Sequence, residues 1–400
     1  MKICAVICEY NPFHSGHLYQ LTKVPAKFDK IACIMSGNFV QRAEPAIVNK
    51  RIRAQAALNA GADIVVENPV LYAVANGEKF ASGAIKTLAA LPNVKGLIMG
   101  CETDSPEIIE KIADTQLSED AVFGDEFSKC MQSGASYAAA YCNATAVSMK
   151  NKGYDEQQIR TIISQPNNLL CIEYIKSIRR LNLDIEPVVI KRRGNGYNST
   201  SVYGDYLSAG AIRNILLSQS YNDALPYLPG GDQLISALKN GNCADYALYD
   251  NISLYNIRNA ETRQLAELYD CTEGLEYLLT KYAESSADLK ETLSAVKSKR
   301  YTFARLKRIV LQLNLGITKD VMHRVENETL PFHVIAIKND FKPYLAQIKE
   351  KAIVRNSDYD KFSSYDYLFK IEKRAAALYA TITHSSGGFY GDMLVTDKLI

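Results

Sequence analysis

The sequence predicts an α/β fold, a doubly wound parallel sheet followed by a mainly helical C-terminal region. Two observations predict the sheet. In the first hundred residues, short apolar runs rich in β-branched residues alternate with stretches of helical periodicity, and those runs are almost free of polar residues. Strand and helix repeated in this order mean right-handed crossovers and parallel strands. Strands that are apolar on both faces are expected where helices cover both sides of a sheet.

The individual elements follow from the same patterns. Strands are expected at 2–8, 30–35, 63–66 and 94–99, with helices at 16–23, 47–60 and 77–91 between them. Residues 105–163 have mostly helical periodicity, and Pro166 opens a further amphipathic helix. A strand is expected at 186–190, and Ser208 can cap a helix that begins near Ala209. Beyond Pro229 the pattern is helical to about residue 314, with one strand-like run at 333–337.

These elements suggest two domains. Residues 1–228 are expected to form the α/β domain, with a helical insertion at about 105–163, and residues 229–400 a mainly helical domain. A chain of 400 residues is long enough for two or three domains.

Charge and composition exclude several classes of protein. The formal net charge is only +2, so a polyanion would have to meet a local basic patch. Apolar runs are shorter than the roughly 18 residues that a membrane helix needs, and the start of the chain is too short for a signal peptide. The nine cysteines show no metal-ligand spacing. We therefore expect a cytoplasmic protein with reduced thiols, no membrane contact and no evident protein partner.

The loop that follows the first strand carries the clearest chemistry. It contains His14 and His17, which are three residues apart at the start of a helix and separated by Gly16. In an open parallel sheet, ligands bind beyond the carboxyl ends of the strands, where helix N-termini offer free N–H groups to anions. Two imidazoles at this spacing lie on one face and can donate hydrogen bonds to a polyphosphate. The alternative is a structural turn whose histidines satisfy local backbone groups.

The segment Asn11-Pro12-Phe13-His14-Ser15-Gly16-His17 resembles the His-x-Gly-His signature of the adenylyl-transferring superfamily. Further segments resemble the tRNA(Met) cytidine acetate ligase family: 9–19, Met35-Ser36-Gly37-Asn38-Phe39-Val40-Gln41-Arg42, Gly61-Ala62-Asp63, Phe80-Ala81-Ser82-Gly83-Ala84 and Gln165-Pro166-Asn167-Asn168. The resemblance is strong over about 1–215 and weaker beyond, through Ser298-Lys299-Arg300-Tyr301-Thr302.

This resemblance implies a nucleotidyltransferase-like ATP-binding catalytic domain followed by a tRNA-binding domain. Members of the family convert acetate and ATP to acetyl-adenylate and then acetylate N4 of the wobble cytidine of elongator tRNA(Met). His14 and His17 would be the catalytic residues, and Mg²⁺ would bridge the phosphates because the sequence shows no all-protein metal cage. The resemblance implies ATP contacts at Ile7, Cys8, Glu9, Tyr10, Asn11, Pro12, Phe13, His14, Ser15, Gly16, His17, Leu18, Tyr19, Gln20, Gly100, Asn167, Arg192 and Arg193. Arg193 would contribute its backbone.

Basic residues between 297 and 308 are the best candidates for RNA contact. Six of them occur with no acidic residue between them, and aromatic residues are interleaved. We expect tRNA contacts from Lys299, Arg300, Arg305 and Arg308. A solvated basic helix face is the alternative.

The sequence also departs from the family pattern. Ala43 and Cys171 stand where the family usually has glycine, and the segment around Gly210 lacks the threonine of the superfamily's phosphate-binding helix start. Phosphate contact by Ser208 or Arg213 and simple capping by Ser208 are therefore about equally expected. Two alternative functions are compatible with the same first loop: that of a small-molecule adenylyltransferase, and that of an RNA-binding protein without catalytic activity.

Overall fold

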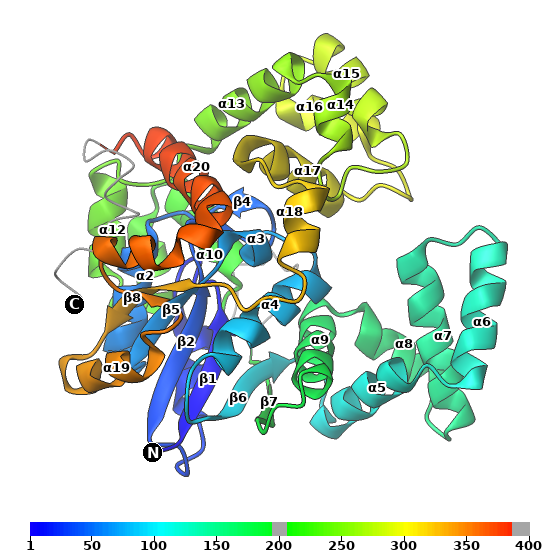
Figure 1. Cartoon of the computed structure of the whole chain (residues 1–400), viewed down its shortest axis with the longest axis horizontal. Coiled ribbons are helices and arrows are strands. Elements are labelled where there is room, and N and C mark those ends of the chain that lie inside the picture. Colours follow the sequence, from blue (N-terminus) through cyan, green and yellow to red (C-terminus); the bar gives the residue numbers. More distant parts are fainter. Residues whose placement is uncertain (194–205, 386–400) are drawn as a thin grey trace.

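Seven strands form the central sheet of the computed structural model, which describes residues 1–193 and 206–385 (Figure 1). Their order across the sheet is β7-β6-β1-β2-β5-β8-β9. Their bounds are β1 (Ile3–Cys8), β2 (Lys30–Ser36), β5 (Ile64–Asn68), β6 (Val94–Cys101), β7 (Glu186–Lys191), β8 (Phe332–Ile337) and β9 (Ala352–Ile353). From β7 to β5 all neighbours are parallel, which confirms the predicted doubly wound α/β fold.

The sheet receives strands from both halves of the chain. The strand expected at 333–337 is present as β8, and it pairs antiparallel with β5. An open edge at β5 would leave a row of backbone N–H and C=O groups without hydrogen-bond partners, and β8 provides those partners. The predicted division at residue 228 therefore does not coincide with the end of the sheet, and it remains a proposal about function.

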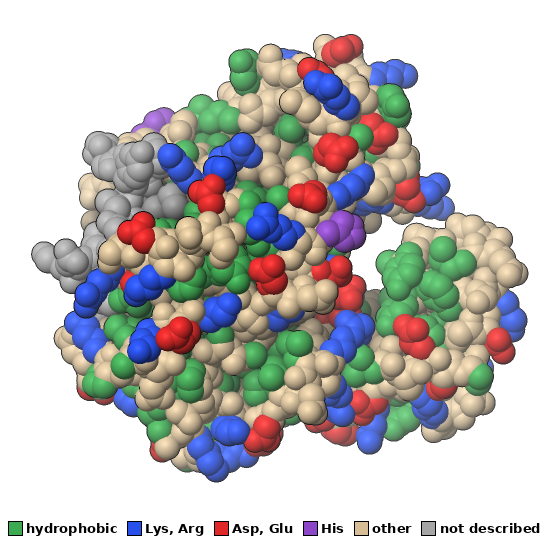
Figure 2. All heavy atoms as spheres, in the orientation of Figure 1, with side chains coloured by type: hydrophobic (Ala, Val, Ile, Leu, Met, Phe, Trp, Pro, Cys, Tyr) green, Lys and Arg blue, Asp and Glu red, His purple; other side chains and the backbone are tan. Residues whose placement is uncertain are grey.

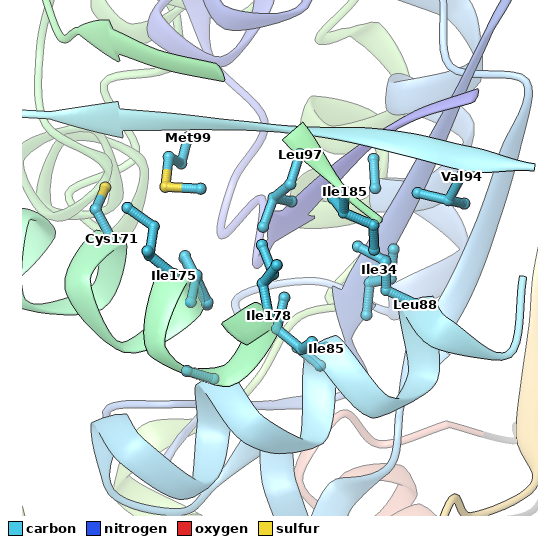
Figure 3. Close-up of a cluster of buried hydrophobic side chains, with 14 of the residues drawn as sticks. Ile34, Ile85, Leu88, Val94, Leu97, Met99, Cys171, Ile175, Ile178 and Ile185 are labelled. Atoms are coloured by element: carbon cyan, nitrogen blue, oxygen red, sulfur yellow. The ribbon is translucent and has the colours of Figure 1, made fainter. Parts of the chain in front are cut away.

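Alternate side chains of each strand pack on opposite faces. Ile3 and Ala5 lie in one apolar cluster with α4 (Gly77–Ala89) and α9 (Pro166–Arg180). Figure 3 shows residues of β6 facing those of α4 and α9, Leu97 and Met99 among them. Cys4 and Val6 lie in the cluster on the other face, with α1 (Ser15–Thr22) and α2 (Lys50–Asn59). This two-residue period explains why the strands read as unbroken apolar runs.

Two groups of helices extend from the sheet. The predicted insertion forms a lobe between β6 and α9 (Figure 1). Its helices are α5 (Pro106–Ser118), α6 (Ala121–Gln132), α7 (Tyr137–Asn151) and α8 (Glu156–Ser164). The remaining helices are α3 (Val70–Ala73), α10 (Ala209–Leu217), α11 (Tyr221–Ala224), α12 (Asp232–Lys239), α13 (Tyr246–Asn259), α14 (Thr262–Ala266), α15 (Leu275–Ser285), α16 (Leu289–Val296), α17 (Phe303–Leu315), α18 (Lys319–Arg324), α19 (Leu345–Ile348) and α20 (Asp366–Ile382).

The space-filling view shows the insertion lobe standing apart from the lobe formed by α13 to α17 (Figure 2). Basic and acidic side chains are interspersed on this face, as the small net charge leads one to expect. Within the described ranges, every helix is too short or too polar to cross a bilayer.

A short hairpin that the sequence did not predict lies beside the end of β1. It consists of β3 (Phe39–Val40) and β4 (Glu44–Pro45). Ala43 in its turn has φ of +55°, in the left-handed region where glycine is favoured. This conformation explains why glycine is suited to the position in the family that the sequence resembles.

Candidate active site

A cleft opens where β1, β6 and β7 end and where α1, α9 and α10 begin. Three helix N-termini at the carboxyl edge of a parallel sheet favour the binding of an anion. Fourteen of the residues predicted to contact ATP line the cleft: Ile7, Cys8, Glu9, Tyr10, Asn11, His14, Gly16, His17, Tyr19, Gln20, Gly100, Asn167, Arg192 and Arg193. Four others in the same loop and helix do not line it: Pro12, Phe13, Ser15 and Leu18.

His14 and His17 form a reciprocal cap at the start of α1. Nδ1 of His14 accepts a hydrogen bond from the backbone N–H of Gly16 at 3.0 Å, and Nδ1 of His17 accepts one from the backbone N–H of His14 at 3.3 Å. The two rings stack, with centroids 3.7 Å apart. A Cβ at Gly16 would lie 2.8 Å from the His14 ring, so glycine makes room for this stacking.

Both imidazoles are neutral near pH 7. Burial, helped by the charges of Arg192 and Arg213, lowers the pKa of His14 to about 3. Burial and the neighbouring His14 likewise lower the pKa of His17 well below its usual value. Because each Nδ1 accepts a backbone N–H, the proton of each neutral ring is on Nε2. The capping role and the ligand-binding role are therefore compatible, since each ring uses one nitrogen for the cap and keeps an N–H donor.

Basic side chains approach the histidines from β7 and α10. Arg192 follows β7, and its backbone N–H donates to the carbonyl oxygen of Cys101 at 2.8 Å. A Cβ at Gly100 would lie 2.9 Å from Cγ of Arg192, so Gly100 gives this arginine its space. The guanidinium of Arg193 lies 4.8 Å from the centroid of the Tyr19 ring. The side chain of Arg193 thus contacts another cleft residue, whereas the sequence assigned it only a backbone role.

Asn167 lies in the first turn of α9 and is not its N-cap, which is Gln165. Its side-chain amide donates to Glu102 Oε1 at 2.5 Å. The neighbouring Asn168 accepts from the backbone N–H of Glu102 at 2.7 Å. Together these bonds tie the start of α9 to the end of β6, so Asn167 is held at the wall of the cleft.

A buried arginine fixes the loops around the cleft. Arg53 of α2 donates to the carbonyl oxygens of Glu9, Ser36, Gly37 and Val48. Its side chain is about 1 % exposed. Arg53 therefore neither contacts phosphate nor lies on a solvated helix face, because its donors are used on backbone. Charge patterning cannot show such a role, since the four acceptors lie in three separate segments.

Three residues that line the cleft were not among the site residues predicted from the sequence. Gln41, Arg42 and Glu44 line it from the β3–β4 hairpin. The backbone N–H of Gln41 donates to Glu9 Oε1 at 2.6 Å. The motif 35–42 was recognised by its resemblance, but a two-residue strand has no periodicity that would have placed it at the site.

Ser208 is the N-cap of α10, as expected, and its hydroxyl accepts from the N–H of Ala211 at 3.1 Å. Ser208, Gly210 and Arg213 all line the cleft, and phosphate contact by Ser208 or Arg213 stays a prediction. Cys171 also lines the cleft, and burial raises the pKa of its thiol, which therefore stays protonated.

The residues predicted to bind tRNA lie on α17 and in the turn before it. Arg300 and Arg305 pair with Glu273, and Arg308 pairs with Asp270 at 2.9 Å. Only 12 % of the Arg308 side chain is exposed. In place of the tRNA contact expected of Arg308, its guanidinium is used within the lobe formed by α13 to α17. Lys299 is exposed, and no acid among the described residues pairs with it.

Three potential metal ligands gather away from the cleft. Glu67, His333 and Glu372 have ligand atoms within 4.8 Å of one another. The ammonium group of Lys50, however, lies 2.7 Å from Glu67 Oε2, so a cation already neutralises Glu67. In the described part of the cleft the acidic residues are Glu9 and Glu44.

Comparison with known proteins places this geometry in context. The model of the HIGH Nucleotidyl Transferase family matches residues 1–388. A tRNA(Met) cytidine acetate ligase of Thermoanaerobacter sp. (strain X514) is 34 % identical, with 98 % of each chain covered. Another, of Caldicellulosiruptor saccharolyticus, is 36 % identical, with 95 % of this chain and 94 % of the relative covered.

Solved structures agree over the whole chain. Thermotoga maritima TmcAL in its apo form superposes with a TM-score of 0.94 at 26 % identity, covering 100 % of this chain and 99 % of the other. The same protein bound with alpha-thio ATP superposes with a TM-score of 0.91 at 25 % identity, covering 99 % and 98 %.

Proposed function

Since the chain belongs to the HIGH nucleotidyl transferases and, within them, to the tRNA(Met) cytidine acetate ligase family, we propose that it activates acetate with ATP and acetylates N4 of the wobble cytidine of elongator tRNA(Met). The observation that carries this proposal is the pair of stacked, neutral imidazoles at the anion-binding edge of the sheet. The alpha-thio ATP complex of the similar Thermotoga protein supports a nucleotide in this cleft.

The first step forms acetyl-adenylate. A carboxylate oxygen of acetate bonds to the α-phosphorus of ATP while the bond from that phosphorus to the bridging oxygen breaks, and pyrophosphate leaves. Negative charge builds on the phosphate oxygens during this displacement. The Nε2–H groups of His14 and His17 would donate to these oxygens, and Arg192 and Arg213 would add positive charge beside them. Neutral donors avoid the cost of placing further positive charge in the buried cleft.

The second step transfers the acetyl group. The cytosine N4 amine attacks the acetyl carbonyl carbon, the bond from that carbon to the phosphate oxygen breaks, and AMP leaves as the amine loses a proton. Acetyl-adenylate is a mixed anhydride and reacts with water, so the site must exclude water until RNA is bound. The cytidine must be turned out of its loop to reach the cleft, which suits recognition of single-stranded RNA.

Asn167, Gly100 and the arginines after β7 would hold the nucleotide, and the loop 7–20 would hold its phosphates. Mg²⁺, when bound, supplies compensation of phosphate charge. Glu9 accepts the N–H of Gln41, and Glu44 pairs with Arg213, so the described cleft offers carboxylates that already have partners. ATP oxygens would therefore be its main ligands, as Mg²⁺ commonly prefers.

We assign the ATP chemistry to residues 1–228 and RNA binding to the helices of 229–400. Lys299 is the candidate RNA contact that is exposed and has no acidic partner among the described residues. Arg300 and Arg305 would have to exchange Glu273 for RNA phosphates, since both are paired with it.

One incubation tests the whole proposal. The protein is combined with labelled acetate, ATP, Mg²⁺ and total tRNA, and the nucleosides are then separated. We expect label in N4-acetylcytidine. Release of pyrophosphate that depends on a nucleotide monophosphate rather than acetate would instead indicate a small-molecule adenylyltransferase. Tight tRNA binding without any acetyl transfer would indicate an RNA-binding protein without catalysis.

A further inference from the structure

Glu44 shares its carboxylate between two cations from distant parts of the chain. Its Oε1 accepts a hydrogen bond from a terminal nitrogen of Arg213 at 3.1 Å, and its Oε2 lies 3.6 Å from Nζ of Lys307. Arg213 belongs to α10 and Lys307 to α17. The function proposed above gives this acid no role, although it lines the cleft.

Arg213 is held from two sides. One terminal nitrogen donates to the carbonyl oxygen of Asn11 at 2.7 Å, and the other donates to Glu44. These two bonds fix the plane of the guanidinium, whose side chain is only 14 % exposed. A guanidinium has five N–H donors, and within the described ranges two of them have partners, so three are left for a ligand in the cleft. The Asn11 bond also ties Arg213 to the loop that carries His14.

A carboxylate in the wall of a polyanion site is unfavourable unless its charge is compensated. Here Arg213 and Lys307 flank Glu44, so the three groups together carry one net positive charge. Half of the Lys307 side chain is exposed, which makes its pair with Glu44 a weak one. The bond to Arg213 is shorter and more buried, and it is therefore the main partner of this acid.

The hairpin turn places Glu44 where it can make these contacts. Val40 of β3 pairs with Glu44 of β4, and the backbone N–H of Ala43 donates to the Val40 carbonyl at 2.8 Å. A tight turn between two short strands leaves Glu44 little freedom to move away from Arg213.

We propose that Glu44 is a positioning residue that orients Arg213 across the cleft so that its remaining N–H groups meet the phosphates of ATP. The inference rests on the proposed function only in taking a nucleoside triphosphate as the ligand. A flexible arginine would have to lose its rotamer freedom on binding, whereas this one has lost it already.

A double-mutant cycle tests this role. Glu44→Ala, Arg213→Ala and the double variant are titrated with a nonhydrolysable ATP analogue in a calorimeter. We expect Glu44→Ala to weaken binding roughly tenfold, and the double variant to bind no more weakly than Arg213→Ala. Independent losses that multiply in the double variant, or unchanged binding by Glu44→Ala, would overturn the proposal.

Further variants separate orientation from folding. Glu44→Asp keeps the charge on a shorter side chain and should recover part of the affinity, and it replaces the alanine variant if that one does not fold. Lys307→Ala is the matched control, because Lys307 contacts the same carboxylate from outside the cleft. It should change ATP affinity less than twofold. A loss of ATP affinity as large as that of Glu44→Ala would show that Glu44 acts by holding Lys307 of α17 rather than by orienting Arg213. Acetate does not enter this measurement, so failure of the acetylation assay would leave its result unaffected.

Discussion

The imidazole of His14 stacks on that of His17 with ring centroids 3.7 Å apart, and each ring uses Nδ1 to cap the helix that both residues begin. This arrangement leaves each Nε2 as a hydrogen-bond donor. One small unit therefore fixes the tautomer, the orientation and the position of both rings.

His14→Asn should separate capping from catalysis. Asparagine is a good N-cap and can still accept the Gly16 N–H, but it lacks the imidazole donor. We expect the rate of acetate-dependent pyrophosphate release to fall by about 10²–10³-fold with little change in the melting temperature. His323→Asn serves as the control, because His323 is exposed and outside the cleft. Replacing both His14 and His17 with Ala should abolish the exchange of pyrophosphate into ATP, and an unchanged exchange rate would refute the assignment.

Folding stability should fall as the solution is acidified below pH 6.5. The pKa of His14 is about 3 in the folded protein and 6.5 in the unfolded chain, so between these values the unfolded state binds the extra proton. The contribution of His14 to the free energy of unfolding is fully present above pH 6.5 and is lost progressively as the pH falls toward 3. Urea unfolding at pH 7.5 and pH 5 should show a loss of at most about 2 kcal/mol from this residue. His14→Asn should show a smaller difference between the two pH values, and equal differences would contradict the depressed pKa.

Glu67→Gln should be strongly destabilising. Glu67 and Lys50 form a buried ion pair, and the amide would leave the Lys50 ammonium without its counter-charge. We expect a loss of about 3–5 kcal/mol in the free energy of unfolding. Despite burial, which by itself raises it, Lys50 and His333 lower the pKa of Glu67 to about 2. Its contribution is therefore present above pH 4.5 and is lost as the pH falls toward 2.

The control for Glu67→Gln is Glu326→Gln, which removes an exposed pair with Lys79. It should cost less than about 1 kcal/mol. Similar losses in both variants would mean that the Lys50 ammonium finds other partners.

Gly100→Ala should weaken nucleotide binding without unfolding the protein. The added methyl group would lie 2.9 Å from Cγ of Arg192, a flexible side chain that can move away. Movement of Arg192 removes positive charge from the cleft, so we expect a several-fold higher dissociation constant for an ATP analogue. Gly124→Ala has open space around it in α6 and should bind like the wild type while gaining about 1 kcal/mol of stability. Wild-type affinity in Gly100→Ala would show that Arg192 is not needed for binding.

Lys299→Ala and Arg308→Ala should change different properties of the protein, tRNA binding in the first and thermal stability in the second. Lys299 is exposed, so its loss should weaken tRNA binding and reduce the slope of log affinity against log salt by about 1. Arg308 is paired with Asp270 inside the lobe, so its loss should instead lower the melting temperature. Filter binding at several salt concentrations, together with thermal unfolding, distinguishes the two. If Arg308→Ala reduced the salt slope without loss of stability, the pairing with Asp270 would not hold in solution.

The residues that could be placed from the sequence belong to short continuous segments. β1, β2, β5 and β6 were predicted because a strand covered on both faces needs an unbroken apolar run. The His14–His17 loop was placed at the sheet edge because the end of one strand and the start of the next helix are adjacent in the chain. Fold class and catalytic loop are thus encoded locally, in periodicity and in a spacing of three residues.

Partners of the charged residues could not be read in this way. Arg53 donates to backbone in three segments, and Arg213 meets Glu44. β8 pairs with β5, and its His333 contacts Glu67, which lies 266 residues earlier in the chain. A charge has no periodicity, and its partner is whichever opposite group the folded chain brings within a few ångströms. The sheet and the loop could consequently be predicted from the sequence alone. The positioning of Arg213, the burial of Arg53 and the pairing of Arg308 were decided only by the tertiary structure, because each depends on distant segments packing together.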